Sequence, residues 1–158
     1  MLTLPKEVEE ALLKEAIKKG LDPEVLLLDK LSSSLDPKSR VKVYLEKSRE
    51  LIQRAEKYLA EGDLAQASEK AWGGAPPRSR PTPRRRGLEH FRHRDLEEVV
   101  SRMITENKGD KTLIAGWGAC LRLHSNFYEG FMTREDVEAT VGLVKEFLER
   151  VTSLVAKG

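Results

Sequence analysis

Hydrophobic residues recur at helical spacing along most of the chain. Residues 37–61 place apolar side chains four or seven positions apart, on one face of a predicted helix: Val41, Leu45, Ile52 and Leu59. The stretch behind Thr133 repeats this pattern from Val137 to Val155. Alternation typical of a strand occurs only in LTL at residues 2–4. The pattern therefore predicts an all-α fold, an antiparallel up-and-down helical bundle, preceded by one short strand.

Prolines, glycines and capping residues divide the chain into helices. Pro5 opens the first helix, Gly20 ends it, and Gly62 ends the long helix. An aspartate that can cap a helix N-terminus precedes each of three further helices: Asp22, Asp36 and Asp63. Two more helices are predicted over HRDLEEVVSRMITE and KTLIAGWGACLRLH, and TRED before the last helix resembles a capping box. We expect a strand-helix-helix unit at residues 1–35, a possible dimerisation element, and a bundle at residues 36–158.

The core of the bundle is expected to hold five large side chains: Trp72, Trp117, Leu121, Val144 and Phe147. Small residues flank Trp117 in IAGWGACL. The glycines of this string do not form a phosphate-binding loop, and their position inside an apolar helix predicts close packing against a neighbouring helix.

Composition narrows the classes of protein. The chain has 158 residues, 39% of them hydrophobic and 34% charged, with a formal net charge of +2. A nearly neutral chain needs a local basic patch to bind nucleic acid. The single Cys120 excludes an internal disulfide framework and fits a reducing cytosol. We therefore expect a cytoplasmic protein that neither carries a secretory signal nor contacts a membrane, and the many Lys and Glu residues favour a thermophile.

The segment GGAPPRSRPTPRRRG at residues 73–87 interrupts the helical pattern. Three interpretations stay open: a flexible basic linker, a nucleic-acid-binding arm that uses its arginines, and a stretch translated in the wrong frame. Read one frame over, GC-rich coding would give an alanine-rich helix that continues SEKAWG. In the second interpretation, the arm would bind phosphates through Arg78, Arg80, Arg84, Arg85 and Arg86. The functional prediction is therefore made without this segment.

Three strings in order along the bundle resemble the archaeal PaREP family, over about residues 38–157. They are AEKYLAEGDLAQASEKAWG, RGLEHFRHRDLEEVV and LRLHSNFYEG. That family looks like a branch of the HEPN superfamily, so the resemblance implies a HEPN-like bundle of up-and-down topology. The chain departs from it at GAPPRSRPTPRR, where such proteins would continue an alanine-rich helix.

The N-terminal unit separately resembles ribbon-helix-helix proteins. This resemblance implies that its strand pairs with the strand of a second chain, and that the paired strands enter DNA. Only Thr3 is a plausible outward polar residue on this strand, and no Arg or Lys flanks it. The pattern therefore supports a ribbon-helix-helix fold more than it supports recognition of DNA. The alternative is that the two helices form a pair that packs on the bundle. Because LTLP finds no partner in its own chain, a symmetric homodimer is expected.

Many HEPN proteins that cleave RNA carry an Arg and a His separated by four to six residues. Such spacings join Arg85 to His90 and Arg86 to His93, in or beside the irregular segment. Near the final helix, Arg122 and His124 are only one residue apart, so the motif is absent where it is expected. If the protein cleaves RNA, His124 or His90 would transfer the proton beside Arg122 or another arginine, without a metal.

Four hydrogen-bonding side chains near the end of one apolar helix form the candidate ligand-binding cluster: His124, Asn126, Tyr128 and Glu129. They could line a pocket in which a histidine binds an anion. Alternatively, His124 and Asn126 cap the helix while Phe127 and Tyr128 pack below it. His90, His93 and Cys120 do not have the spacing of a closed zinc site, so neither a metal nor a cofactor is expected.

These observations predict a non-catalytic helical interaction module whose ligand is a nucleotide or a nucleic acid. The alternatives are a toxin-type ribonuclease and a ribbon-helix-helix DNA-binding regulator.

Overall fold

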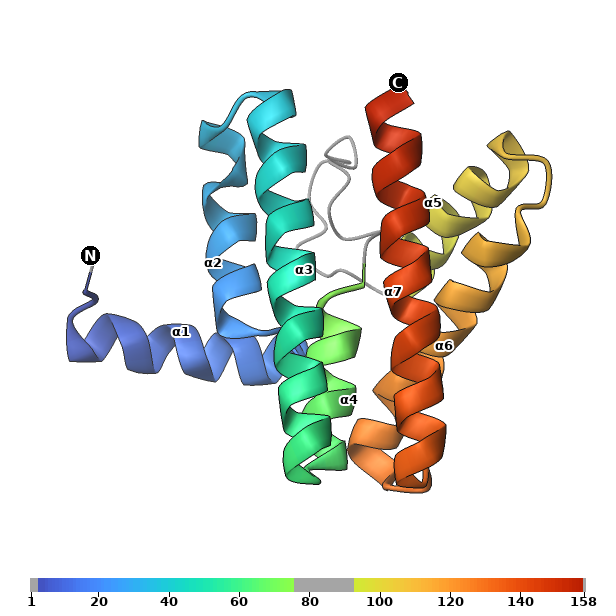
Figure 1. The fold of residues 1–158 in the computed structure, drawn as a ribbon. Coiled ribbons are helices and arrows are strands. Elements are labelled where there is room, and N and C mark those ends of the chain that lie inside the picture. Colours follow the sequence, from blue (N-terminus) through green and yellow to red (C-terminus); the bar gives the residue numbers. More distant parts are fainter. Residues whose placement is uncertain (1–2, 76–92, 158) are drawn as a thin grey trace.

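The computed structural model describes residues 3–75 and 93–157 of the chain (Figure 1). These residues form α-helices, one short 3-10 helix and no strand. The elements are α1 Lys6–Lys19, α2 Pro23–Leu31, η1 Ser32–Ser34, α3 Pro37–Glu61, α4 Leu64–Gly73, α5 His93–Glu106, α6 Lys111–Glu129 and α7 Arg134–Lys157. The predicted all-α fold is confirmed.

Four helices form an antiparallel bundle. In Figure 1, α3 and α6 run downward while α4 and α7 run upward. α3 packs against α4 and α7, and α6 packs against the same two helices, so the four close on one another. α5 packs against α6 and adds Val100 and Met103 to the core, while α1 extends away from the bundle across the lower end of α2. No helix in the described part of the chain is long and apolar enough to cross a membrane.

The predicted helix boundaries are confirmed by the caps. The carboxylates of Asp22, Asp36 and Asp63 accept hydrogen bonds from the first-turn amides of α2, α3 and α4, at 3.0–3.1 Å. Gly20 and Gly62 end their helices in the left-handed conformation, with φ of 61° and 84°. A residue without a Cβ adopts this conformation at little cost.

The expected N-terminal strand is wrong for the residues described. Thr3, Leu4 and Pro5 belong to no regular element, and α1 begins at Lys6. A strand is held by hydrogen bonds to a neighbouring strand, and residues 3–75 and 93–157 contain none. The alternation in LTL alone therefore does not order this segment within a single chain.

The predicted core is largely correct. Trp72, Trp117, Val144 and Phe147 are at most 5% exposed and belong to one apolar cluster at the centre of the bundle. Leu121 lies at the edge of that cluster and is only partly buried. Val25 of α2 is also buried, but it lies outside the cluster.

Gly116 sets the distance between α6 and α7. A Cβ placed on Gly116 would lie 2.2 Å from the Cβ and 2.5 Å from the Cγ of Phe147. Real Cβ atoms do not approach other atoms so closely, so the two helix backbones can cross here only over a glycine. The close packing predicted around Trp117 is confirmed at this residue, whereas a Cβ on Gly118 would meet no atom within 4 Å.

Substitution of Gly116 by Ala should therefore push α6 away from Phe147 and lower the free energy of unfolding by roughly 1–3 kcal/mol. Gly118→Ala, in the same helix, is the matched control. It should raise the free energy of unfolding by about 0.5–1 kcal/mol, because alanine is the better helix former. Denaturant unfolding followed by circular dichroism measures both. Equal effects of the two substitutions would contradict the close crossing.

Asp110 joins the start of α6 to α7. Its Oδ1 accepts hydrogen bonds from the amides of Thr112 and Leu113, at 2.9 and 3.1 Å. Its Oδ2 accepts one from Nε of Arg150, at 2.6 Å. The Arg150 hydrogen bond, together with the two amides, holds the pKa of the Asp110 carboxyl below its ordinary value.

This lowered pKa gives a pH-dependent contribution to stability. Because the folded-state pKa is depressed, the contribution is complete above the ordinary aspartate pKa of about 3.9 and is lost as the pH falls through the lowered value. We expect the free energy of unfolding of the wild type to exceed that of Asp110→Asn near neutral pH, and the difference to shrink in acid. The difference in the free energy of unfolding between the wild type and Arg150→Gln should shrink in acid in the same way. If the difference in the free energy of unfolding stayed constant down to strong acid, this would argue against a stabilising pair of Asp110 and Arg150.

Polar side chains hold α2 on the bundle. Asp22 pairs with Lys70 of α4, at 2.9 Å between Oδ2 and Nζ, and both side chains are largely buried. The hydroxyl of Tyr44 on α3 donates to the carboxylate of Asp29 on α2. Burial and this neighbouring carboxylate raise the pKa of the Tyr44 phenol above its ordinary value. α2 is thus tied to α3 and α4 by charged and polar contacts, in addition to its buried Val25 and Leu26.

Candidate functional site

His124 lies in a row of aromatic side chains that leads from the core to the surface. Its ring is 4.4 Å from that of Trp72 on α4, measured between centroids, and 5.2 Å from Tyr128, which meets it edge-on. Trp72 is in turn 5.9 Å from Trp117. We call Trp117, Trp72, His124 and Tyr128 the aromatic row. Its inner end is buried, His124 is half-buried, and Tyr128 is 63% exposed.

The exposed end of the aromatic row lies beside the end of α1. A Cβ built on Gly20 would be 3.4 Å from the hydroxyl oxygen of Tyr128. Phe127 also meets Tyr128 edge-on, with centroids 4.9 Å apart. The Tyr128 ring is thus held between α6 and the α1–α2 turn, and much of it remains open to solvent.

Asn126 belongs to the core. It is 2% exposed, its Nδ2 donates to the hydroxyl of Ser68 on α4 at 2.9 Å, and its Oδ1 accepts from the amide of Met132 at 2.7 Å. Both ends of the amide are therefore used to connect α4, α6 and the turn before α7. These side-chain contacts join neighbouring elements and do not cap α6, whose C-terminal cap is Gly130. A ligand that bound the Asn126 amide would have to displace them.

Replacement of Asn126 by Ala should lower the free energy of unfolding by roughly 1–3 kcal/mol, since the Met132 amide would lose its acceptor inside the protein. Ser125→Ala, at the exposed neighbouring position, should change it by about 0.5 kcal/mol or less. Thermal and denaturant unfolding of both variants make the comparison. If Asn126→Ala were as stable as the wild type, the hydrogen bonds of the Asn126 side chain would not be needed for stability, and in the wild type a ligand could displace them.

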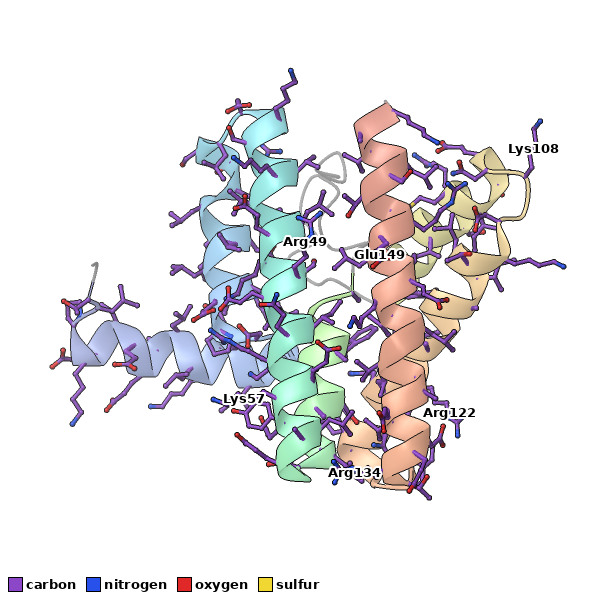
Figure 2. All side chains as sticks on the ribbon, in the orientation of Figure 1. Arg49, Lys57, Lys108, Arg122, Arg134 and Glu149 are labelled. Atoms are coloured by element: carbon purple, nitrogen blue, oxygen red, sulfur yellow. The ribbon has the colours of Figure 1, made fainter. Side chains whose placement is uncertain are left out.

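Arg122 lies away from the aromatic row. Figure 2 shows it on the outer side of α6 and α7, where its guanidinium pairs with Asp136 at 2.5 Å and lies 6.0 Å from the centre of the Phe131 ring. Residues two apart on a helix do not face each other, and His124 accordingly turns to Trp72. The structure thus does not bring Arg122 and His124 together. Glu129, the last residue of α6, is exposed.

The remaining candidate residues are placed only in part. His90 lies outside the described residues, as do Arg78, Arg80, Arg84, Arg85 and Arg86. His93 is the first residue of α5, and Cys120 is buried in the core. Within the described chain, no group of three or more His, Cys, Asp or Glu side chains could hold a metal ion.

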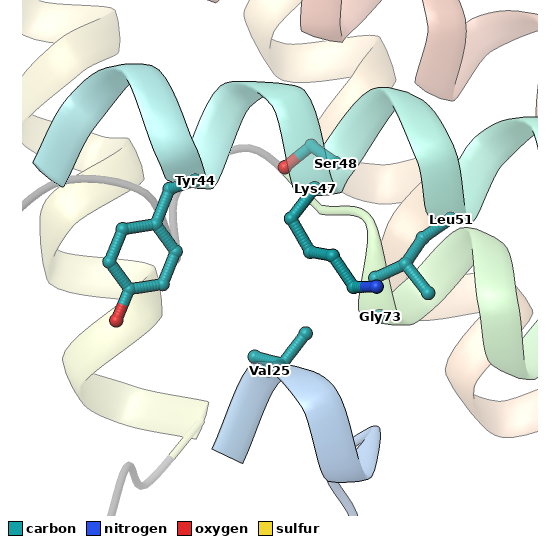
Figure 3. A pocket seen from close by; sticks show the side chains of 6 residues that line it. All are labelled: Val25, Tyr44, Lys47, Ser48, Leu51 and Gly73. Carbon is teal, nitrogen blue, oxygen red and sulfur yellow. The ribbon is translucent and has the colours of Figure 1, made fainter. Parts of the chain in front are cut away.

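A small pocket lies between α2, α3 and the end of α4 (Figure 3). Its lining includes Val25, Tyr44 and Lys47, and it has room for little more than a water molecule. The Lys47 amine pairs with the carboxylates of Glu24 and Glu50. This pocket therefore belongs to the packing contact between α2 and α3.

Fold and sequence together place the chain among all-α proteins with an antiparallel bundle. It matches the profile of the archaeal PaREP1/PaREP8 family over residues 43–76 and 80–148, which is more than half of its length. The chain belongs to this family. The match begins within α3 and ends within α7, so α1 and α2 lie outside it, and its gap falls in the proline-arginine segment. No curated protein and no solved structure matches significantly.

Sequence reasoning missed the contact between Trp72 and His124. Trp72 is predicted as a core residue and His124 as a site residue, and the two meet because α4 packs against α6. No local pattern reports on a pairing between distant helices. The only signal is that both residues belong to apolar helices of the same bundle.

Proposed function

We propose that this PaREP protein is a non-catalytic interaction module with a HEPN-like bundle, which acts as a cytoplasmic homodimer and binds a nucleotide or a single-stranded nucleic acid. The observation that carries the proposal is the aromatic row. It supplies an exposed ring, Tyr128, backed by His124 and connected through Trp72 to a rigid core.

The chemistry of such a surface suits a nucleobase. Every base has a flat π-face that stacks on an aromatic ring whatever its sequence. Tyr128 offers a ring face and a hydroxyl, and its ring lies at 87° to that of His124. An imidazole N–H next to the stacked base can also donate a hydrogen bond to a phosphate oxygen. The row thus offers both contacts that a nucleotide needs within one turn of α6.

The order of the helices supports the HEPN-like part of the proposal. α3, α4, α6 and α7 alternate in direction, as the up-and-down topology implied by the resemblance requires. The family match covers this same region. α1 and α2 are then an addition to the bundle.

Stacking can be tested by measuring the affinity for a short fluorescein-labelled single-stranded RNA and for AMP. Tyr128→Ala should weaken binding roughly 5- to 150-fold, because base stacking contributes about 1–3 kcal/mol per base. Phe131→Ala is the matched control, since Phe131 is also an exposed aromatic, 51% accessible, but lies beside Arg122. Equal losses in both variants, or no binding by the wild type, would contradict the proposal.

The same mixtures test the ribonuclease alternative, because electrophoresis shows whether the RNA stays intact. RNA that remains uncut while Tyr128→Ala loses affinity supports a binding module. Cleavage that disappears in His124→Ala or His90→Ala would replace the proposal with a metal-independent nuclease.

A further inference from the structure

A buried ion pair joins the turn between α1 and α2 to α4. Oδ2 of Asp22 lies 2.9 Å from Nζ of Lys70, and the two side chains are only 5% and 15% exposed. The other oxygen of Asp22 accepts a hydrogen bond from the amide of Glu24 at 3.0 Å and so caps α2. One carboxylate therefore fixes the turn both to the helix that follows it and to α4. We call Asp22 and Lys70 the turn pair.

Each residue of the turn pair is two positions from a residue that contacts the aromatic row. Gly20, two residues before Asp22, is the residue whose Cβ would approach the Tyr128 hydroxyl at 3.4 Å. Trp72, two residues after Lys70, packs on the ring of His124 with 4.4 Å between the centroids. α4 thus carries both the cation that holds the turn and the ring that supports the site.

A second contact places the turn on α4. A Cβ built on Gly73 would lie 3.8 Å from the Cβ of Asp22, so the aspartate packs directly on the last turn of that helix. Gly73 also lines the small pocket together with Val25 of α2 (Figure 3). The turn pair is therefore enclosed between α2 and the end of α4.

The turn pair is the polar contact that bears most directly on the position of the turn. α1 contributes little, because Ala16 is its one fully buried residue. The buried Val25 and Leu26 hold α2, but they follow the turn and lie farther along the chain from Gly20. Removing either partner of a buried ion pair leaves a charge without compensation, so the pair favours a single position of the turn.

We infer that Asp22 and Lys70 are positioning residues of the ligand site: by holding the turn, they hold the Tyr128 ring in place for stacking on a base. Phe127 and His124 meet this ring edge-on from α6, and the turn lies against its hydroxyl. A ring that is already held loses less conformational freedom when a ligand binds. The inference rests on the proposed function and extends it to α1 and α2, which lie outside the family match.

The first experiment measures the affinity for the labelled RNA and for AMP. Asp22→Asn keeps a side-chain oxygen that can cap α2 but removes the charge that pairs with Lys70. It should weaken binding roughly 2- to 12-fold, the effect expected from freeing one side chain before binding. Lys70→Met should weaken binding in the same way, whereas Lys70→Arg, which keeps a cation, should bind like the wild type.

Lys145→Met is the matched control. It also removes the lysine of an ion pair between two helices, the 2.6 Å pair of Lys145 on α7 with Glu56 on α3, and it should leave the affinity unchanged. Circular dichroism checks that each variant keeps its helices. If Lys70→Met fails to fold, Asp22→Asn, with its cap intact, decides the question.

The second experiment observes Tyr128 by NMR without any ligand, in protein that contains isotope-labelled tyrosine. The ring signal of Tyr128 is the one that disappears in Tyr128→Ala. It should shift in Asp22→Asn and Lys70→Met, and it should keep its place in Lys145→Met. If the turn pair only stabilises the fold, the first two variants will melt at a lower temperature without any change in this signal or in affinity, and that result would overturn the inference.

The two proposals fail separately. If the wild type binds neither RNA nor AMP, the proposed ligand is refuted, and the NMR signal decides whether the turn pair positions the Tyr128 ring. If Tyr128→Ala loses affinity while Asp22→Asn binds as tightly as the wild type, the ligand stands and the inference is refuted. Tighter binding by Asp22→Asn together with weaker binding by Lys70→Met would reveal a direct effect of charge on a phosphate, and would also refute the inference.

Discussion

The arrangement of the site depends on the buried amide of Asn126. It bonds to Ser68 on α4 and to the Met132 amide before α7, so one side chain fixes the end of α6 against both neighbours. A buried polar group must keep its hydrogen bonds, which makes its position specific. With Asn126 turned into the core, His124 packs on Trp72 and Tyr128 is left at the surface. The same contact thus orders the interior and exposes the ring that we propose for binding.

The local features of the fold could be predicted, because their causes lie within a few residues. Asp22 and Asp36 cap the helices that follow them, and Gly20 ends the helix before it. The strand expected at residues 2–4 depends on a partner that sequence alternation does not supply, and it is absent from residues 3–5. Helix ends are local properties, whereas strand pairing is a property of the whole assembly.

The separation of Arg122 from His124 could be predicted for the same reason. The helical spacing of Arg122 and His124 already indicates that they face apart, and the ion pair of Arg122 with Asp136 agrees. The role of Asn126 could not be read from its neighbours, because Ser68 comes from a helix far earlier in the chain. A polar residue near a helix end looks the same whether it lines a pocket or joins two helices. Only its distant partner distinguishes the two.

The weak attachment of α1 has a consequence for local unfolding. A helix with one fully buried residue gains little from its contacts with the rest of the chain, while α3 and α7 bury whole faces. Segments with few buried contacts open independently of the global transition, at a lower free energy. We therefore expect the backbone amides of α1 to exchange with solvent sooner than those of the bundle, because α1 can unfold while the four packed helices stay intact.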